Sequence, residues 1–401
     1  MSGSIAAFNV GRLPRIAFGA GRIAEVPGIV ASHGRHVLLV TGRRSFRETP
    51  QFGVLVDGLA GVGLAVDELV VDGEPSPELV DEAVTTFRGT TVDVVLGIGG
   101  GSVLDTGKAV AGLLRAETTA LDHLEGVGRG LPYAGPPTPF VAVPTTAGTG
   151  SEATRNAVLS RTGPDGFKKS FRDERLVARD AVVDPELLAG LPPRLIADNG
   201  MDALAQLIES LTSTRASPVT DALAVAGLEA VRDGLVPWFE SEANRSDGTD
   251  ARGAMAFAAL ASGMALAQTG LGSVHGLASP LGARFPIPHG AACGATLVAA
   301  TRVNLEALAA RDPGGPGLAK YAGAGRALSG RRDLDDRAAC EVLVATLGDW
   351  AERLGIGGLS RFGVGEADIT GLVAEAGGTS MRTNPVALTD TEVAAILRAS
   401  L

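Results

Sequence analysis

Two histidines and one aspartate stand where they can hold a metal ion. His275 and His289 lie fourteen residues apart in "GLGSVHGLASPLGARFPIPHGAACG" (270–294), among glycines, prolines and small residues. Upstream, "GMDALAQLIES" places Asp202 and Gln206 at positions i and i+4, which share one face of a helix. A carboxylate in an apolar helix is costly to bury alone. A lone histidine is more often an ordinary hydrogen-bonded residue, but a carboxylate with two imidazoles suits Zn²⁺, Fe²⁺ or Mn²⁺.

Two glycine-rich or hydroxyl-rich loops are candidates for binding a cofactor. In "VVLGIGGGSVLDTGKA" (94–109) a buried strand runs into glycines and then into a helix start, where free N–H groups attract a phosphate. The spacing Gly97, Gly99, Ser102 is not the full dinucleotide fingerprint, and a tight turn without a ligand explains it equally well. The threonines of "VPTTAGTGSEAT" (143–154) either bond a cofactor or satisfy their own backbone. Because ligands collect at the carboxyl edge of an open sheet, the two loops together favour a cofactor site.

Alternating strands and helices are expected to position these loops. The β-branched runs at 36–42, 92–101 and 139–146 are typical of buried strands, and 76–89 has helical spacing with Ser76 as its N-cap. This alternation predicts a mostly parallel sheet. After Asp184 the apolar residues follow helical spacing almost throughout. We therefore predict an α/β dinucleotide-binding domain over 1–190 and an all-α domain over 191–401, with surface loops at 245–250 and 311–317.

Composition excludes several classes of protein. Aromatic residues make up only 4% of the 401 residues, so the core must be built from Ala, Val, Leu and Ile. A net charge of −10 without a long Lys/Arg run argues against nucleic acid as a partner. Two cysteines without a CxxC pair indicate a reducing compartment. The N-terminus has no signal-peptide pattern, and no window approaches about 18 apolar residues. We expect a cytoplasmic protein without a membrane partner.

Five segments of the sequence resemble the motifs of a known family. The segments "GGGSVLDTGKA", "PTTAGTGSEAT", "VVDPELLAGLPP", "GMDAL" and "HGLASPLGARFPIPHG" make the sequence resemble, nearly end to end, the iron-containing (group III) alcohol dehydrogenase family. The resemblance implies the dehydroquinate synthase-like fold of that family, with cofactor and metal between its α/β and helical domains. It also implies an NAD(P)-dependent alcohol dehydrogenase or aldehyde reductase, forming a homodimer and acting on a small aldehyde or primary alcohol.

The resemblance also assigns roles to individual residues. It implies that the cofactor pyrophosphate is wrapped by Gly99, Gly100, Gly101 and Ser102. It implies that the rest of the cofactor is lined by Asp105, Thr145, Thr146, Thr149, Ser151 and Lys168. Three of the four metal ligands of the family match Asp202, His275 and His289, which are thereby also the expected catalytic residues.

Two positions depart from the pattern of the family. Gln206 stands where the family usually has its other histidine ligand, and Ser279 stands where a histidine is often assigned to proton relay. An amide oxygen is a poor ligand for a borderline metal, so Gln206 predicts a weakened site for Fe²⁺ or Zn²⁺. The proton is then expected to pass through water, with Ser279 or the cofactor ribose taking part. Because two walls of the site change at once, a polar or anionic substrate is a further hypothesis.

The end of the first long strand bears on the choice of cofactor. NAD-preferring relatives often carry Asp there, which binds the ribose 2′-OH, whereas this strand ends in Gly42, Arg43, Arg44 and Ser45. The lost carboxylate and the added guanidinium groups favour a 2′-phosphate, so we expect NADP to be preferred over NAD. The alternative is that both arginines face solvent.

Other activities remain open from the sequence. Gln206 and Ser279 leave room for a metal-independent reductase of the maleylacetate reductase type. A dehydroquinate-synthase-like lyase, which uses a Glu and two His, fits less well because of the Asp in "GMDAL" and the "PTTAGTGSE" loop. A binding protein without catalysis fits least, because both cofactor loops are intact.

Overall fold

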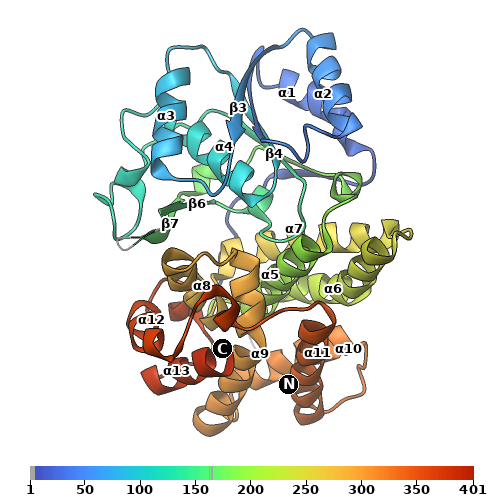
Figure 1. The fold of residues 1–401 in the computed structure, drawn as a ribbon, viewed down its shortest axis with the longest axis vertical. Coiled ribbons are helices and arrows are strands. Elements are labelled where there is room, and N and C mark those ends of the chain that lie inside the picture. The colour runs from blue at the N-terminus through green and yellow to red at the C-terminus, as the bar shows by residue number, and fades with distance from the viewer. Residues whose placement is uncertain (1–4, 162, 164–165) are drawn as a thin grey trace. The chain divides into compact units, whose positions relative to one another are not determined.

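The computed structural model describes residues 5–161, 163 and 166–401. The chain forms two compact units. The sheet unit comprises residues 11–146 and 150–189. The helical unit comprises residues 190–401, residues 147–149 and the described N-terminal residues up to Val10. Figure 1 shows the strands in the blue-to-green part of the chain and helices alone in its yellow-to-red part.

Six described strands of the sheet unit form one parallel sheet, in the order β1-β8-β5-β4-β2-β3. The strands are β1 (Arg15–Phe18), β2 (His36–Gly42), β3 (Ala65–Val71), β4 (Val94–Gly99), β5 (Phe140–Pro144) and β8 (Asp180–Val183). Three of them, β2, β4 and β5, lie within the runs predicted as strands. The predicted α/β class with a mostly parallel sheet is therefore confirmed.

Helices cover both faces of this sheet. Along β2, Val37 and Leu39 belong to one apolar cluster with residues of α1 (Val26–Ala31) and α2 (Pro50–Gly61). Leu38 and Val40 belong to a second cluster with residues of α3 (Pro77–Phe87) and α4 (Gly101–Leu113). Because both faces of the strand are buried, its residues do not alternate between apolar and polar. This explains the continuous apolar run in the sequence.

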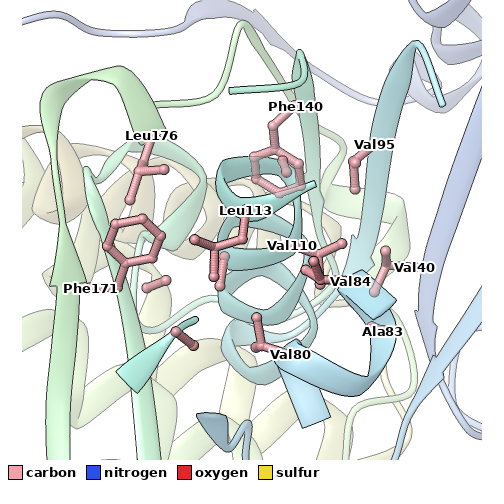
Figure 2. Close-up of a cluster of buried hydrophobic side chains, with 14 of the residues drawn as sticks. Val40, Val80, Ala83, Val84, Val95, Val110, Leu113, Phe140, Phe171 and Leu176 are labelled. Carbon is pink, nitrogen blue, oxygen red and sulfur yellow. The ribbon is translucent and has the colours of Figure 1, made fainter. Parts of the chain in front are cut away.

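Helix α4 lies at the centre of the second cluster. Figure 2 shows Val110 and Leu113 of α4 with Val80 and Val84 of α3 on one side and Phe171 on the other. Helix α3 begins as predicted, because the Ser76 hydroxyl accepts a hydrogen bond from the Leu79 N–H at 3.2 Å. The position of α4 is thus set by apolar packing along its whole length.

Glycine lets α4 approach the sheet closely. A Cβ on Gly97 of β4 would lie 3.0 Å from the Phe140 ring, and one on Gly107 of α4 would lie 2.9 Å from the same ring. A Cβ on Gly99 would lie 2.6 Å from Cβ of Val103. The glycines therefore serve packing as well as the turn, and they bring the N-terminus of α4 to the carboxyl end of β4.

A two-stranded antiparallel hairpin, β6 (Asn156–Arg161) with β7 (Phe167–Arg172), completes the described strands of the sheet unit. We did not predict this hairpin or β3 from the sequence. In β6 the buried residues Ala157 and Leu159 alternate with partly buried ones, so only one face of the hairpin joins the core.

The described part of the helical unit contains helices and no strand, as predicted for the residues after Asp184. The longer helices are α5 (Pro193–Thr212), α6 (Pro218–Asn244), α7 (Thr249–Thr269), α8 (Ser273–Arg284), α9 (His289–Arg311), α10 (Pro316–Ser329), α11 (Asp336–Arg353) and α13 (Asp390–Ala399), with the short α12 (Ile369–Glu375) before the last. The predicted loops at 245–250 and 311–317 fall at the α6–α7 and α9–α10 connections. Helix α5 packs against α6, α7 and α9, so it is the core helix of the unit.

Within the described residues, no single helix has the length and apolar composition needed to cross a membrane. Helices α7 and α8 meet that test only as a pair, and they are bent by 98° where they join.

Candidate functional site

Helix α5 presents three polar side chains inside the core of the helical unit. Asp202, Gln206 and Glu209 follow each other at i, i+4 and i+7, which places them on one helix face. Their exposed fractions are only 1%, 3% and 5%. Burying this many polar groups is costly unless each has a partner. The partners come from α7, α8 and α9.

The two predicted histidines lie at the beginnings of two helices. His275 is in the first turn of α8, and His289 is the first residue of α9. Glu209 fixes the start of α8, because its Oε1 accepts from the Val274 N–H at 2.7 Å and its Oε2 lies 2.6 Å from Nδ1 of His275. One carboxylate therefore caps the helix and orients the imidazole that the helix carries.

These contacts bring the predicted ligands together. Nε2 of His275 lies 3.1 Å from Oδ1 of Asp202, and Nε2 of His289 lies 3.9 Å from the same oxygen. Sγ of Cys293, one turn into α9, lies 3.7 Å from Nε2 of His275 and 3.9 Å from Nε2 of His289. The four potential ligand atoms all lie within 4.8 Å of one another.

The Gln206 amide is not oriented as a metal ligand, although the sequence predicted a weak one at this position. Its Oε1 accepts a hydrogen bond from the Ser262 hydroxyl at 2.7 Å, and its Nε2 donates to Oδ1 of Asp202 at 3.2 Å. The amide oxygen is thus turned toward α7 while the amide N–H groups face the carboxylate. In this arrangement Gln206 positions Asp202.

Ser279 lies one turn after His275 in α8 and is half-buried. Its hydroxyl donates to the carbonyl oxygen of His275 at 3.4 Å, a long bond within its own helix. A bond of this length holds the hydroxyl weakly. The structure therefore places the predicted proton-relay residue next to the His275 backbone.

The charges of the cluster fit a cation. Burial acts to raise the pKa of Asp202, but His289 and His275 outweigh it and the pKa is lowered. Burial acts against a charged His275, yet the interactions with Cys293 and Glu209 and the bond to Asp202 hold the pKa of this imidazole well above its usual value. A proton on His275 thus places one positive charge between the carboxylates of Asp202 and Glu209, and a divalent ion can replace that proton. The donors Asp202, His275 and His289 form the carboxylate–imidazole set that borderline divalent metals accept.

The first cofactor loop joins β4 to α4 at the carboxyl edge of the sheet. Gly99 ends β4, Gly100 precedes α4, and Gly101 and Ser102 form its first turn, where N–H groups are free for an anion. The neighbouring strand β5 brings Thr145 alongside, since its N–H donates to the Gly99 carbonyl at 3.0 Å. The structure thus gathers these predicted residues at one edge.

Thr146 and Thr149 follow Thr145 in the chain and lie in different units. A Cβ on Gly100 would come within 3.2 Å of the Thr146 methyl group, so Thr146 borders the glycine turn in the sheet unit. Thr149 belongs to the helical unit together with Gly148, where a Cβ would lie 2.9 Å from Asn199.

Two other predicted cofactor residues lie in a buried network beneath the loop. Oδ1 of Asp105 accepts from the Ser151 hydroxyl at 2.5 Å, and its Oδ2 accepts from the Val158 N–H at 2.9 Å. Nζ of Lys108, which is fully buried, lies 2.8 Å from the Ser151 carbonyl and 2.7 Å from the Asn156 carbonyl. Burial lowers the pKa of Lys108 to about 8, against the attraction of Asp105. The side chains of Asp105 and Ser151 therefore shape the 151–156 loop, with a lysine that we did not predict.

The remaining predicted cofactor residues belong to the sheet unit, where Arg43, Arg44 and Ser45 are exposed and the Lys168 side chain is 13% exposed. Gly42 ends β2 opposite Val71 of β3. Arg43 pairs with Asp72 at 2.7 Å, Arg44 pairs with Glu48 at 3.1 Å, and Ser45 is exposed. Lys168 of β7 pairs with Glu74 at 3.1 Å. The three charged side chains therefore have protein partners, all of which are themselves more than half exposed.

Comparison with known proteins identifies the class. A family model described as "Iron-containing alcohol dehydrogenase" matches residues 14–185, and one described as "Fe-containing alcohol dehydrogenase family, C-terminal" matches residues 196–401. The chain therefore belongs to the iron-containing alcohol dehydrogenase family. As such it is an NAD(P)-dependent oxidoreductase of the alcohol dehydrogenase and aldehyde reductase type.

Individual relatives agree with this assignment. The chain is 31% identical over 392 residues to the NAD-dependent methanol dehydrogenase of Bacillus methanolicus, covering 97% of this chain and 98% of that one. It is 39% identical over 218 residues to long-chain-alcohol dehydrogenase 1 of Geobacillus thermodenitrificans, an alignment that spans 54% of this chain and 53% of the relative. The solved structure of 1,3-propanediol oxidoreductase superposes with a TM-score of 0.88 at 29% identity, covering 99% and 100% of the two chains.

Three functional residues were missed from the sequence, namely Glu209, Cys293 and Lys108. Each has a simple spacing signal. Glu209 is seven residues after Asp202, Cys293 is four after His289, and Lys108 is three after Asp105. In a helix these spacings place both members of each pair on one face.

Replacing Glu209 with glutamine tests its action through His275. The amide oxygen keeps the cap on the Val274 N–H, but the negative charge beside Nδ1 is lost. We expect the affinity for Zn²⁺ to fall about 10–100-fold, as for other partners that orient a ligand histidine. Competition with a chromophoric chelator measures it. The exposed Glu306→Gln variant in α9 is the control, and equal affinities in the two variants would refute the role of Glu209.

Proposed function

We propose that the protein reduces a small aldehyde to the primary alcohol with NADPH, and catalyses the reverse oxidation, using a divalent metal held by Asp202, His275 and His289. The observation that supports this most strongly is the convergence of one buried carboxylate and two imidazoles from three helices. When bound there, Fe²⁺ or Zn²⁺ supplies a Lewis acid that polarises the carbonyl oxygen and stabilises the alkoxide.

Glu209 and Gln206 orient the side chains that we propose as metal ligands. Glu209 accepts the Nδ1 proton of His275, so that Nε2 of the ring carries the lone pair that a metal requires. Gln206 donates to one oxygen of Asp202 and thereby limits its rotation. Asp202, Glu209 and His275 are buried, and the lower local dielectric constant strengthens the interactions between them.

We infer that the reaction proton reaches the substrate through water. Ser279 takes the place where an imidazole relay was expected from the family resemblance, and its weakly held hydroxyl can pass a hydrogen bond to a water molecule. The cofactor ribose is the other hydroxyl available for this step. We propose a small polar or anionic aldehyde as the substrate because Gln206 and Ser279 replace two histidines expected from the family resemblance.

A preference for NADP rests on the arginines after β2. Arg43 and Asp72 are 69% and 68% exposed, and Arg44 and Glu48 are 78% and 63% exposed. Ion pairs this exposed are worth at most about 1 kcal/mol, so the guanidinium groups can leave their partners for a 2′-phosphate at small cost. No carboxylate follows β2 directly to repel that phosphate, because Gly42, Arg43, Arg44 and Ser45 stand there.

Removal of the metal tests the proposed mechanism. Dialysis against a strong chelator should lower the rate of aldehyde reduction about 100-fold or more, because Lewis-acid stabilisation is worth several kcal/mol. Added Fe²⁺ or Zn²⁺ should restore it. Metal content and rate are measured on the same samples across a panel of small aldehydes. Full activity in metal-free protein would instead favour a metal-independent reductase of the maleylacetate reductase type.

Kinetics with both cofactors test the role of the arginines. We expect a higher kcat/KM with NADPH than with NADH. In Arg43→Ala and Arg44→Ala the value for NADPH should fall about 10–100-fold, the loss of a charge-assisted hydrogen bond, while that for NADH changes little. Arg35→Ala, before the opposite end of β2, is the matched control. A clear preference of the unmodified protein for NADH would refute the proposal.

A further inference from the structure

Cys293 points its thiol at the metal ligands. It lies four residues after His289 in α9 and is fully buried. A buried cysteine often serves as a small apolar residue. Here, however, the sulfur lies 3.7 Å from Nε2 of His275 and 3.9 Å from Nε2 of His289. These are the two nitrogen atoms that the proposed function gives to the metal.

The distances agree with four protein ligands around one ion, to which the substrate oxygen would add as a fifth ligand. With Zn–S near 2.3 Å and Zn–N or Zn–O near 2.0–2.1 Å, the edges of a tetrahedron are about 3.3–3.6 Å long. The structure has edges of 3.1 Å for His275–Asp202, 3.9 Å for His289–Asp202, and 3.7 and 3.9 Å for the two sulfur–imidazole pairs, and all four atoms lie within 4.8 Å of one another. To bind one ion, the side chains must rotate so that the longer separations shorten.

No other side chain of α5 supplies the fourth donor. The oxygen of Gln206 is bonded to Ser262, and Glu209 is engaged by His275 and by the Val274 N–H. Among the described residues, the His, Cys, Asp and Glu side chains gathered here are Asp202, His275, His289 and Cys293.

We propose that Cys293 is the fourth protein ligand of the metal and gives the site a preference for zinc or cobalt over iron. This inference rests on the proposed function, because it concerns the same ion. Coordination replaces the S–H bond by a metal–sulfur bond and releases the thiol proton to solvent. Thiolate is a soft donor that favours Zn²⁺, whereas carboxylate and imidazole alone discriminate less.

Cobalt titration of the chelator-treated full-length protein tests the assignment. Co²⁺ bound to a thiolate gives an intense sulfur-to-metal charge-transfer band in the near ultraviolet, in addition to its weaker visible bands. We expect this band in the unmodified protein and in Cys340→Ser, whose thiol lies in α11 and bonds to the Leu318 carbonyl. It should be absent in Cys293→Ser. The affinity of Cys293→Ser for Zn²⁺ should fall more than the about 10–100-fold caused by losing an outer partner.

The outcomes separate this inference from the proposed function. Visible cobalt bands without the charge-transfer band in the unmodified protein would overturn the role of Cys293 and leave the metal site standing. No cobalt binding at all would overturn both. If Cys293→Ser does not fold, zinc-edge X-ray absorption of the unmodified protein shows whether sulfur is a ligand of the metal. A sulfur neighbour at about 2.3 Å supports the inference, and a shell of nitrogen and oxygen alone refutes it.

Discussion

The buried carboxylate of Asp202 is the constraint on which the helical unit depends. It stands in the middle of α5 with 1% of its surface exposed. Removing such a charge from water costs several kcal/mol unless a positive group is close and its oxygens are hydrogen-bonded. His275 and Gln206 reach the same oxygen, one from α8 and one from α5 itself. Helices α5 and α8 must therefore keep their relative positions to within hydrogen-bond distance.

The sheet unit also contains a buried carboxylate, Asp105, whose charge is compensated by the buried Lys108. Lys108 and Asp105 are both buried in α4, one turn apart. Lys108 donates to the carbonyl groups of Ser151 and Asn156, and Asp105 accepts from the Ser151 hydroxyl and the Val158 N–H. Breaking such a pair would leave an uncompensated charge, at a cost of about 3–5 kcal/mol. The glycine turn above them needs no charge of its own. Its predicted role in binding an anion rests on the backbone N–H groups of the first turn of α4, which have no partner within the helix.

Much of the fold could be predicted because its signals are local. The run 36–42 is strand β2 to the residue, and Ser76 caps α3 as expected. Asp202, His275 and His289 were found because buried charge and imidazole among apolar residues have few explanations. Strand β3 was not predicted because "AVDELVV" lies at the sheet edge, where five of its seven residues are polar or exposed.

The partners of these ligands could not be predicted because they are defined by contacts between helices. The sequence places Gln206 next to Asp202, but only the position of Ser262, 56 residues further on, decides where the amide oxygen points. Likewise, the sequence does not show that Cys293 lies near the histidines. The packing of α8 places Nε2 of His275 3.7 Å from its sulfur. Asp105 and Ser151 were predicted from the motifs to bind the cofactor. In the structure the Ser151 hydroxyl instead donates a hydrogen bond to the Asp105 carboxylate.

The most direct test of the metal centre is anomalous diffraction from crystals grown with added zinc and iron. Data on either side of each absorption edge identify the ion and its position without any variant. The structure predicts a single strong peak within about 2.0–2.3 Å of Asp202, His275 and His289. Well-ordered side chains with no anomalous peak between them, or a peak bound elsewhere in the helical unit, would contradict it.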